Sequence, residues 1–326
     1  MQVRAFDAGE PAAGEAVVRI HFAGISRGDV LHRREIIPFA AKPPYVPGYA
    51  LSGVVEAIGA GIDTLQPGQA VVAVVRSGGY SERIRIPAAR LVAAPAGLDL
   101  AAAAAAALNF FIAIQMLERI ANLRSGQSIL VHGASGGTGV ALLQLAQRMG
   151  ISAWGTCSKA KFVIVERYGG RPIDYRTERF DDVVYTSSPG ISSPGLDAVF
   201  DPIGHFRRSY KILRAGGILV AYGLSDSLRN GKPDRWMATK AFVGGILLPK
   251  LIPDGKRTVF YSAFDLEKSA PQAYAQDLGK VLELLGQGKI DPIVSQVFPL
   301  EQARDAEKLL ESGGVTGTLV LDCRAE

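Results

Sequence analysis

A glycine-rich segment carries the residues of this chain that point most directly to chemistry. Gly133–Gly139 reads GASGGTG and follows the short apolar run Ser128–His132. The apolar residues of Val140–Met149 then recur at helical spacing, and Gly150 ends that pattern where helices favour glycine. A glycine loop between a strand and a helix lets backbone amides approach a pyrophosphate and points the helix N-terminus at its negative charge. The segment is therefore a candidate phosphate-binding loop.

Three positions of this loop correspond to the glycine pattern of dinucleotide-binding proteins. Gly136 is expected to permit close approach of the pyrophosphate and Gly139 to allow tight packing of the helix on the strand, whereas Ala134 replaces the first glycine. The strand before the loop and the helix after it favour a dinucleotide site over the alternative, a turn with only a structural role. The predicted contacts are Ser135, Gly136, Gly137 and Thr138.

The end of the next predicted strand, Ser152–Thr156, indicates which dinucleotide binds. An NAD site has Asp or Glu there to accept a hydrogen bond from the ribose 2′-hydroxyl. The residues that follow here are CSKAK and include no carboxylate. The hydroxyl of Ser158 and the ammonium groups of Lys159 and Lys161 could hold a 2′-phosphate, which predicts NADP(H). Alternatively, the two lysines are ordinary surface residues, which would leave the missing acid unexplained.

The part of the chain before the loop has the pattern of a compact β barrel. Short β-branched or alternating runs are separated by glycine and proline turns. The predicted strands are Glu15–Ala23, Leu51–Ile58, Gln69–Val75 and Tyr80–Ile86. The alanine-rich segment Leu100–Leu123 predicts one long helix or two abutting ones.

From Gln127 onward, strands alternate with helices, which is typical of a parallel sheet with right-handed crossovers. The predicted strands are Ser128–His132, Ser152–Thr156, Ala198–Phe200, Gly217–Tyr222 and Val259–Ser262, with a helix at Lys159–Tyr168. In the tail, helices are predicted at Ala273–Leu285 and Leu300–Leu310, and strands at Val294–Phe298 and Gly317–Leu321. The fold class is therefore α/β.

Length and composition exclude several classes of protein. A chain of 326 residues that is 48% hydrophobic is long enough for about two domains with cores of their own. The net charge of +5 is scattered, and the pairs Arg33-Arg34 and Arg207-Arg208 lack the flanking basic residues of a nucleic-acid footprint. Cys157 and Cys323 cannot form a disulfide framework or a zinc site built on cysteines, which favours a reducing, cytoplasmic compartment.

No membrane segment is expected from the sequence. Met1–Glu10 carries Arg4, Asp7 and Glu10 and has no apolar core, so it is not expected to be a signal peptide. The longest apolar run, Leu100–Leu117, consists mostly of alanine, which contributes little to membrane transfer. A buried helix is the better interpretation of this run.

With these motifs in place, the chain resembles the zinc-free quinone oxidoreductase-like branch of the medium-chain dehydrogenase/reductase superfamily. The order and spacing of the matching residues hold over almost the whole chain. They are Ala23–Ser26 with Asp29, Pro44–Tyr49, Gly53–Val55 before Ile58-Gly59, Pro67-Gly68, Gly79–Glu82, Gly133–Gly139, Ile173–Arg176, Asp201–Gly204 and Gly314–Leu321.

The resemblance implies two domains. A GroES-like β-barrel substrate domain would comprise residues 1–103 and 266–326, and a Rossmann domain with a doubly wound parallel sheet would comprise residues 104–265. It implies a cleft between them and a homodimer joined through the Rossmann sheet edges. Tyr175 would form a wall of the 2′-phosphate pocket, and Gly223 would contact the cofactor. The family's opening strand is expected to be absent.

The resemblance also bears on metal and catalysis. Zinc-dependent relatives place a cysteine where Ile25-Ser26 lies and a histidine-glutamate pair where Tyr49-Ala50 lies, so no metal is expected. The candidate proton donors are Tyr45 and Tyr49, on the segment that matches the cleft lining, and Ser26. Alternatively, the tyrosines only shape an apolar pocket. His32 is a possible relay but is more readily interpreted as solvated.

Two functions from different classes follow. The first is an NADPH-dependent reductase that transfers hydride to a small electrophilic substrate, a quinone or an α,β-unsaturated carbonyl compound. The second is a nucleotide-binding adaptor or regulator with little catalysis. Leu31, Ile112 and Thr318 stand where the family often has tyrosine, threonine and lysine, and such an altered nicotinamide pocket would be the signature of the second.

Overall fold

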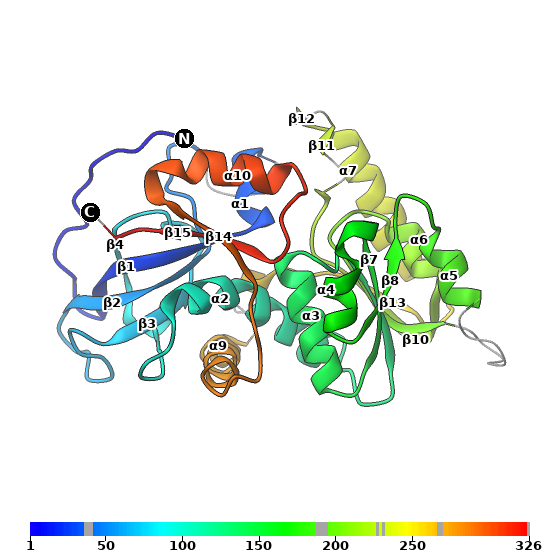
Figure 1. Cartoon of the computed structure of the whole chain (residues 1–326), viewed down its shortest axis with the longest axis horizontal. Coiled ribbons are helices and arrows are strands. Elements are labelled where there is room, and N and C mark those ends of the chain that lie inside the picture. The colour runs from blue at the N-terminus through cyan, green and yellow to red at the C-terminus, as the bar shows by residue number, and fades with distance from the viewer. Residues whose placement is uncertain (36–41, 187–194, 226–227, 230–231, 266–269, 325–326) are drawn as a thin grey trace. The chain divides into compact units, whose positions relative to one another are not determined.

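The computed structural model describes residues 1–35, 42–186, 195–225, 228–229, 232–265 and 270–324 (Figure 1). The chain divides into two compact units, Met1–Phe111 with Glu267–Glu326 and Ile112–Leu266. The predicted boundary at residues 103 and 104 falls inside the same helix as the observed division, nearer its N-terminus. The two units are described one after the other.

The first unit is built on one mainly antiparallel sheet. In its described residues the strand order is β14-β15-β1-β2-β3-β5, and β4 also pairs with β1. The strands are β1 (Glu15–Ile25), β2 (Ala50–Ile58), β3 (Ala70–Val74), β4 (Arg83–Pro87), β5 (Val92–Ala93), β14 (Val294–Pro299) and β15 (Thr318–Asp322). The four strands predicted before residue 87 and the two in the tail are thus confirmed, and residues 1–14 contain no strand.

Strand β1 changes partners along its length. Residues 15–19 pair with β4, residues 22–25 pair with β15, and β2 runs along the other edge of both halves. Two register shifts interrupt the β1–β2 pairing, and such bulges bend a strand and increase its twist. The enclosed side includes Val18, Ile20 and Leu51, all fully buried. This bent sheet is the β core of the unit, for which the sequence predicted a compact β barrel.

Short helices and one long helix surround the sheet. They are α1 (Arg27–Arg33), a 3₁₀ turn (Ala88–Arg90), α9 (Pro271–Gly286), a 3₁₀ turn (Leu300–Gln302) and α10 (Ala303–Glu311). Tyr274 on α9 accepts a hydrogen bond from the Val74 amide at 2.9 Å and donates to the Arg90 carbonyl at 2.8 Å. The Tyr274 side chain therefore connects helix α9 to strand β3 and to the 3₁₀ turn at Ala88–Arg90.

The alanine-rich segment forms α2 (Leu100–Ile114), which continues as a π-helical turn over Gln115–Ile120. The combined helix is long and apolar enough to cross a membrane by length and composition alone. However, 72% of its most apolar window is buried inside the protein, and Ala103–Ala107 are almost completely buried. A core helix passes the same test, so the structure supports the predicted buried helix.

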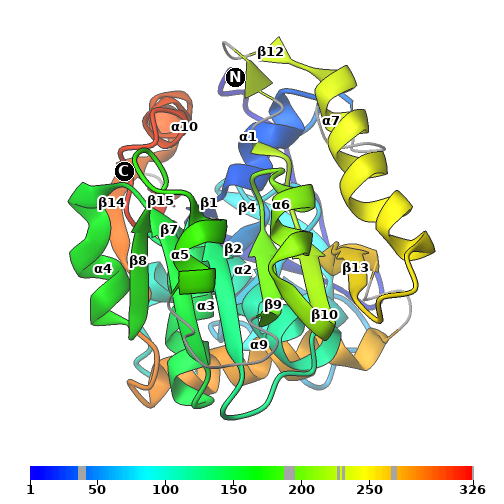
Figure 2. The ribbon, with the colours of Figure 1, turned by 90° about the vertical axis from the view of Figure 1, so that its right-hand side faces the viewer.

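The second unit contains a parallel sheet with strand order β13-β10-β9-β6-β7-β8 in its described residues (Figure 2). The strands are β6 (Ser128–His132), β7 (Ser152–Cys157), β8 (Gly170–Asp174), β9 (Leu196–Asp201), β10 (Leu213–Ala221) and β13 (Arg257–Phe260). Five of these were predicted, whereas β8 was not. A two-stranded ribbon, β11 (Leu228–Arg229) and β12 (Lys232–Pro233), lies outside the sheet.

Helices connect the parallel strands. They are α3 (Gly137–Arg148), a 3₁₀ turn (Lys159–Lys161) before α4 (Phe162–Arg167), α5 (Phe180–Thr186), α6 (Phe206–Lys211) and α7 (Arg235–Phe242), followed by a π turn (Val243–Leu247) and a 3₁₀ turn (Leu248–Leu251). Gly150 has φ +69° directly after α3, as predicted for the residue that ends that helix.

The connectivity of this sheet fixes where a ligand can bind. From β6 the chain moves outward through β7 to β8, then crosses back to β9 on the other side of β6 and continues to β10. Such a reversal is a topological switch point, and ligands of open α/β sheets bind there, beyond the carboxyl ends of the strands. The residues that follow β6, β7 and β9 are therefore the ones to inspect.

Candidate functional site

The glycine loop begins at the carboxyl end of β6 and is held by the neighbouring strand. Gly133 has φ +66°, a left-handed conformation that favours glycine. Its amide donates to the Thr156 hydroxyl at 3.2 Å, and the Ala134 amide donates to the Thr156 carbonyl at 3.0 Å. The Gly136 amide then donates back to the Gly133 carbonyl at 3.0 Å. The loop is thus a closed turn anchored on one residue of β7.

The structure explains the glycines at residues 136 and 139 of the loop in different ways. A β-carbon at residue 139 would lie 2.4 Å from the Gly133 carbonyl oxygen, so close packing of α3 on the loop requires Gly139. A β-carbon at residue 136 would meet only that same oxygen, at 3.4 Å, and Gly136 has an ordinary extended backbone with φ −80°. The fold itself does not need a glycine at residue 136. Open space at this position leaves room for the ligand contact that the sequence predicts, and the contact itself stays a prediction.

The N-terminus of α3 suits an anion. Its N-cap is Gly136, which has no side chain to cap the helix, and its first turn contains no acidic residue. Gly136, Gly137 and Thr138 are partly exposed, whereas Ser135 is only 7% exposed. The amides of an uncapped first turn and the helix dipole both favour negative charge. Of the four predicted contacts, three are thus accessible, and Ser135 lies beneath them.

The predicted 2′-phosphate residues follow β7 and β8, which are neighbours. The Tyr175 amide donates to the Cys157 carbonyl at 3.3 Å, which brings the ends of the two strands together. The Tyr175 side chain is 58% exposed, and the Ser158 hydroxyl makes no capping bond at the start of its 3₁₀ turn. Lys161 is half-buried at the end of that turn.

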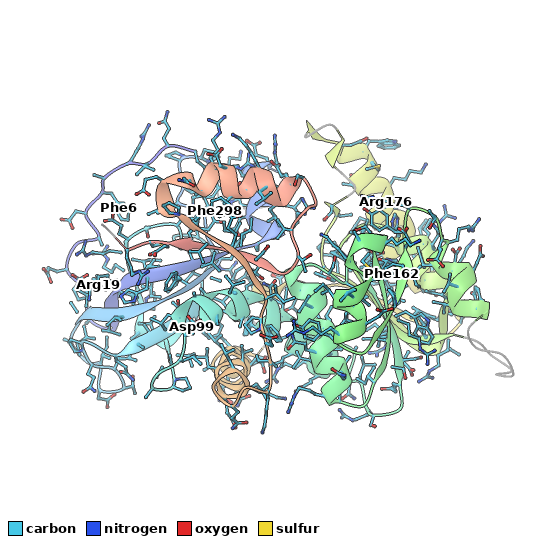
Figure 3. All side chains as sticks on the ribbon, viewed as in Figure 1. Phe6, Arg19, Asp99, Phe162, Arg176 and Phe298 are labelled. Carbon is cyan, nitrogen blue, oxygen red and sulfur yellow. The ribbon has the colours of Figure 1, made fainter. Side chains whose placement is uncertain are left out.

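Arg176 is a further basic residue at this edge, which the sequence analysis did not single out (Figure 3). Its guanidinium carbon lies 5.7 Å from the centre of the Tyr175 ring. Burial lowers the pKa of Lys161, and the positive charge of Arg176 lowers it further, whereas Cys157 raises it. Lys161 and Arg176 therefore share one electrostatic environment that a dianionic phosphate would stabilise.

Gly223 follows β10 at the same edge of the sheet. A β-carbon at residue 223 would lie 2.8 Å from the Pro202 carbonyl oxygen, so the loops after β9 and β10 approach each other because residue 223 is glycine. The packing of these loops accounts for this glycine without a ligand. A contact between Gly223 and a cofactor stays a prediction.

In the first unit, Tyr45 and Tyr49 surround a buried histidine. The Tyr49 hydroxyl lies 2.9 Å from His32 Nδ1, and the Tyr45 ring stacks on the imidazole at 4.2 Å between centroids. His32 is 6% exposed, so the interpretation of it as solvated is wrong. The interpretation failed because His32 lies on α1, a short helix that was not predicted. The buried residues of this helix include Asp29 and His32.

Burial controls the protonation of the two tyrosines. It is the largest cause that raises the pKa of Tyr45 to about 12, with smaller contributions from the negative charges of Glu307 and Asp29. Burial and Asp29 likewise raise the pKa of Tyr49. Both phenols therefore keep their protons at neutral pH. The Tyr45 hydroxyl is buried without a hydrogen-bond partner, whereas that of Tyr49 faces His32.

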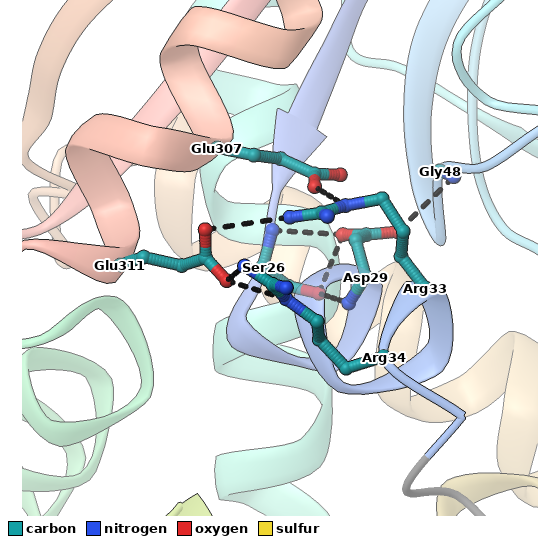
Figure 4. A network of polar contacts seen from close by, with 7 residues as sticks. All are labelled: Ser26, Asp29, Arg33, Arg34, Gly48, Glu307 and Glu311. Atoms are coloured by element: carbon teal, nitrogen blue, oxygen red, sulfur yellow. Dashed lines mark hydrogen bonds and ion pairs between the residues drawn. The ribbon is translucent and has the colours of Figure 1, made fainter. Parts of the chain in front are cut away.

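Ser26, the third candidate proton donor, caps α1 (Figure 4). Its hydroxyl donates to Asp29 Oδ2 at 2.7 Å, and its amide donates to the same oxygen at 2.8 Å. The other oxygen of Asp29 accepts a hydrogen bond from the Gly48 amide at 3.1 Å. Burial raises the pKa of Asp29 to about 7, although these hydrogen bonds oppose the shift. Asp29 thereby fixes the backbone directly before Tyr49.

Ion pairs join α1 to α10 beside this cluster (Figure 4). Arg33 Nε lies 2.5 Å from the buried Glu307, and Arg33 and Arg34 both contact Glu311. These contacts come from residues far apart in the sequence and hold the helix that carries His32. The group formed by His32, Tyr45 and Tyr49 is therefore positioned from two sides, by Asp29 and by α10.

The three departures from the family pattern have different surroundings. Leu31 lies on α1 and is 7% exposed, and Ile112 is half-buried in α2. The Thr318 hydroxyl accepts a hydrogen bond from Asn109 Nδ2 at 2.9 Å inside the first unit. Among the described residues, three or more His, Cys, Asp or Glu side chains nowhere gather as metal ligands.

Comparison with known proteins places these features in a family. The profile "Alcohol dehydrogenase GroES-like domain" matches residues 12–96, and the profile "Zinc-binding dehydrogenase" matches residues 170–321. Quinone oxidoreductase of Rattus norvegicus is 26% identical over 319 residues, which cover 95% of this chain and 90% of the relative. The chain belongs to the quinone oxidoreductase-like medium-chain dehydrogenases/reductases.

Other similar proteins extend the comparison. The synaptic vesicle membrane protein VAT-1 homolog of Danio rerio is 31% identical over 320 residues, which cover 96% of this chain. The chain spans only 65% of the length of that relative. The structure of Escherichia coli quinone oxidoreductase complexed with NADPH aligns with a TM-score of 0.85 and 24% identity, over 98% of this chain and 95% of that one. This chain and the Escherichia coli structure share the fold of a GroES-like domain and a Rossmann domain.

Proposed function

We propose that this chain is a zinc-independent, NADPH-dependent oxidoreductase that reduces quinones or α,β-unsaturated carbonyl compounds. The observation that carries the proposal is the open space at Gly136, in a loop whose backbone geometry does not itself demand glycine. It supports a ligand that contacts the backbone at the N-terminus of α3, which suits a pyrophosphate. Family membership and the NADPH complex of the Escherichia coli relative agree with this ligand.

The second unit supplies the groups that would hold the cofactor. The first turn of α3, at Gly137 and Thr138, would lie against the pyrophosphate. Ser158, Lys161 and Arg176 would hold the 2′-phosphate beside the exposed ring of Tyr175. NADPH, when bound, supplies the hydride. The chain contributes orientation and selectivity for the phosphorylated dinucleotide.

The first unit supplies a proton. Tyr49 keeps its proton at neutral pH and faces His32 Nδ1, so the phenol can donate to a substrate carbon or oxygen and recover its proton through the histidine. An enone needs such a donor because its α-carbon must be protonated. A quinone needs it less, since the product oxygens can take protons from water.

The absence of cysteine and histidine at the positions of the zinc ligands supports chemistry without a metal. Tyr49-Ala50 and Ile25-Ser26 provide no imidazole, carboxylate or thiolate where the zinc-dependent relatives have them. The substrate must then be electrophilic already. We further propose a cytoplasmic homodimer that acts on a small molecule, with neither nucleic acid nor membrane as a partner.

A nucleotide-binding adaptor with little catalysis is the second candidate. It is favoured by Thr318, which has no amine and whose hydroxyl is engaged by Asn109. In that case the cofactor site would be retained for binding alone.

The two candidates are separated by cofactor binding and turnover measured on the same preparation. NADPH affinity is determined by titration calorimetry, and NADPH oxidation is followed with a panel of quinones, enones and simple alcohols. Binding with turnover of quinones or enones supports the reductase. Tight binding without turnover of any compound favours the adaptor, and no binding contradicts both.

A further inference from the structure

A chain of buried polar side chains starts at the glycine loop. Thr156, which accepts the Gly133 amide, has its hydroxyl 3.1 Å from His132 Nδ1. The other ring nitrogen, Nε2, lies 3.2 Å from the Ser209 hydroxyl. Ser209 in turn donates to Asp201 Oδ2 at 2.9 Å. A continuous path therefore leads from the loop backbone to a carboxylate.

The fold brings these residues together at the switch point of the sheet. His132 and Asp201 are the last residues of β6 and β9, and Thr156 is opposite His132 in β7. Ser209 lies on α6, which follows β9. None of the four side chains belongs to a residue that is more than 4% exposed. Their polar groups must therefore satisfy one another, because an unmade buried hydrogen bond is costly.

Counting donors and acceptors assigns a direction to each hydrogen bond between Gly133 and Asp201 along this path. The single Ser209 hydroxyl hydrogen is directed to Asp201, so Ser209 can only accept from His132 Nε2. Nε2 then carries the hydrogen, and Nδ1 of the neutral ring accepts from the Thr156 hydroxyl. The Thr156 oxygen remains free to accept from its remaining neighbour, the Gly133 amide.

Neutral histidine is required for this pattern, and the surroundings favour it. Burial lowers the pKa of His132 to about 4, Asp201 opposes this shift, and the nearby His205 and Arg208 add to it. A second hydrogen on Nδ1 would oppose the Thr156 hydroxyl hydrogen. The other oxygen of Asp201 accepts the amides of Ile203 and Gly204, at 2.8 and 3.0 Å.

We propose that His132, Ser209 and Asp201 are positioning residues of the dinucleotide site, which fix the Thr156 hydroxyl as the acceptor for Gly133. The loop is thereby held in its binding conformation before the ligand arrives. Gly133 is the residue that matters, because its carbonyl also accepts the Gly136 amide and so sets the backbone that faces the pyrophosphate. The proposal rests on the proposed function, since it assumes that this loop binds NADPH.

The substitution Asp201→Asn tests the assigned direction of these hydrogen bonds. The new amide retains one oxygen for Ile203 and Gly204 but places hydrogens where Ser209 now donates. Ser209 must then donate to His132 Nε2, and the hydrogen of the imidazole moves to Nδ1. Nuclear magnetic resonance of protein with ¹⁵N-labelled histidine distinguishes the two tautomers, and His132→Gln assigns the signal. We expect Nε2–H in the wild-type protein and Nδ1–H in Asp201→Asn.

NADPH affinity tests the consequence for the loop. We expect Asp201→Asn to weaken NADPH binding by about tenfold. The hydrogen on Nδ1 would then occupy a lone pair of the Thr156 oxygen, so the hydroxyl must turn away from the orientation in which it now accepts the Gly133 amide. Ser209→Ala, which leaves Asp201 its two backbone donors, should weaken binding in the same direction. The matched control is Asp197→Asn, which alters an aspartate of the same strand, β9, whose partners include Ser128 and Arg214. It should change neither the tautomer nor the affinity.

The outcomes separate this inference from the proposed function. If wild-type His132 carries its hydrogen on Nδ1, or is protonated at neutral pH, the hydrogen-bond assignment is refuted whether or not NADPH binds. The predicted tautomers with unchanged NADPH affinity in folded Asp201→Asn and Ser209→Ala overturn the positioning role. A wild-type protein that shows the predicted tautomer but binds no NADPH refutes the proposed function and the positioning role, and leaves only the hydrogen-bond assignment. If Asp201→Asn does not fold, Ser209→Ala alone decides the positioning role.

Discussion

The imidazole of His32 lies flat on the ring of Tyr45, with the ring centroids 4.2 Å apart and the ring planes inclined by 8°. The same imidazole presents Nδ1 to the Tyr49 hydroxyl at 2.9 Å. Two tyrosines thus contact one histidine in different ways, one through its face and one through a hydrogen bond. This difference allows the packing role and the proton-transfer role to be tested separately.

Tyr49→Phe should slow enone reduction by about 100-fold and quinone reduction by less than about threefold, because only the enone needs a proton on carbon. The measurement is steady-state turnover of NADPH with one substrate of each class. Tyr45→Phe is the matched control. It removes a buried hydroxyl that has no partner, so both activities should persist and stability should change by about 1 kcal/mol or less, in the favourable direction. Equal loss of both activities in Tyr49→Phe would contradict a role in proton donation.

NADPH should bind at least about tenfold more tightly than NADH, since one charge-assisted contact contributes about 1.5–3 kcal/mol. Lys161→Ala should erode this preference without changing NADH affinity, and Arg176→Ala should act in the same way. Lys159→Ala, at an exposed position in the same 3₁₀ turn, should lower the preference less than Lys161→Ala, because water screens an exposed charge more strongly. Titration calorimetry with both cofactors provides the dissociation constants, and equal values for NADPH and NADH would refute the assignment.

Gly136→Val should abolish NADPH binding and leave the protein folded, because a β-carbon there meets only one atom, at 3.4 Å. Gly139→Ala should instead destabilise the fold, by about 1–3 kcal/mol, because its β-carbon would lie 2.4 Å from a backbone oxygen. Circular dichroism with thermal melting and NADPH titration measure the two effects. Native NADPH affinity in a folded Gly136→Val protein would show that the loop is only structural.

The stability of the Rossmann unit should fall as the pH decreases from about 6.5 to about 4. The pKa of His132 is lowered from 6.5 to about 4 by burial, so in this range the unfolded chain binds a proton that the folded chain does not. The full effect is about 3 kcal/mol. Asp29 acts in the opposite direction, because its raised pKa makes the folded first unit hold a proton below about pH 7.

Tryptophan fluorescence can isolate the His132 effect. Both tryptophans lie in the Rossmann unit, and Trp154, in β7, is 6% exposed, so its emission reports the unfolding of this unit. Urea unfolding at a series of pH values should show the slope in the wild-type protein and a smaller one in His132→Gln. A wild-type stability that is constant over this range would contradict the buried neutral histidine.

Activity should survive exhaustive chelation, and the purified protein should contain no stoichiometric zinc. Catalytic zinc polarises an oxygen of the substrate and so supports alcohol oxidation, whereas the positions of the zinc ligands here hold Tyr49-Ala50 and Ile25-Ser26. Simple alcohols should therefore be poor substrates even with excess NADP. Metal analysis and activity before and after chelation check this. About one zinc per chain, with activity lost on chelation and restored by zinc, would overturn the metal-free mechanism.

The sequence by itself determined the elements whose signal is local. Short β-branched or alternating runs between glycine and proline turns located β1 to β4. The glycine loop between β6 and α3 was recognisable because turn, strand and helix signals coincide within a few residues. The order of these elements and the family motifs then indicated the two folds. The missing acid after β7 is also a local property, and it pointed to Ser158 and Lys161 without any coordinates.

Other features could be decided only by the tertiary structure, because they depend on which segments face each other. Helix α1 is too short to show a clear apolar period, so the burial of His32 and its bond to Tyr49 appeared only once the chain was folded. Arg176 joins Lys161 because β7 and β8 are neighbours, and β8 has a weak signal with proline inside it. The path from Gly133 to Asp201 connects residues that lie up to 77 positions apart in a single step, from His132 to Ser209. Such contacts are set by the strand order of the sheet, which no local pattern encodes.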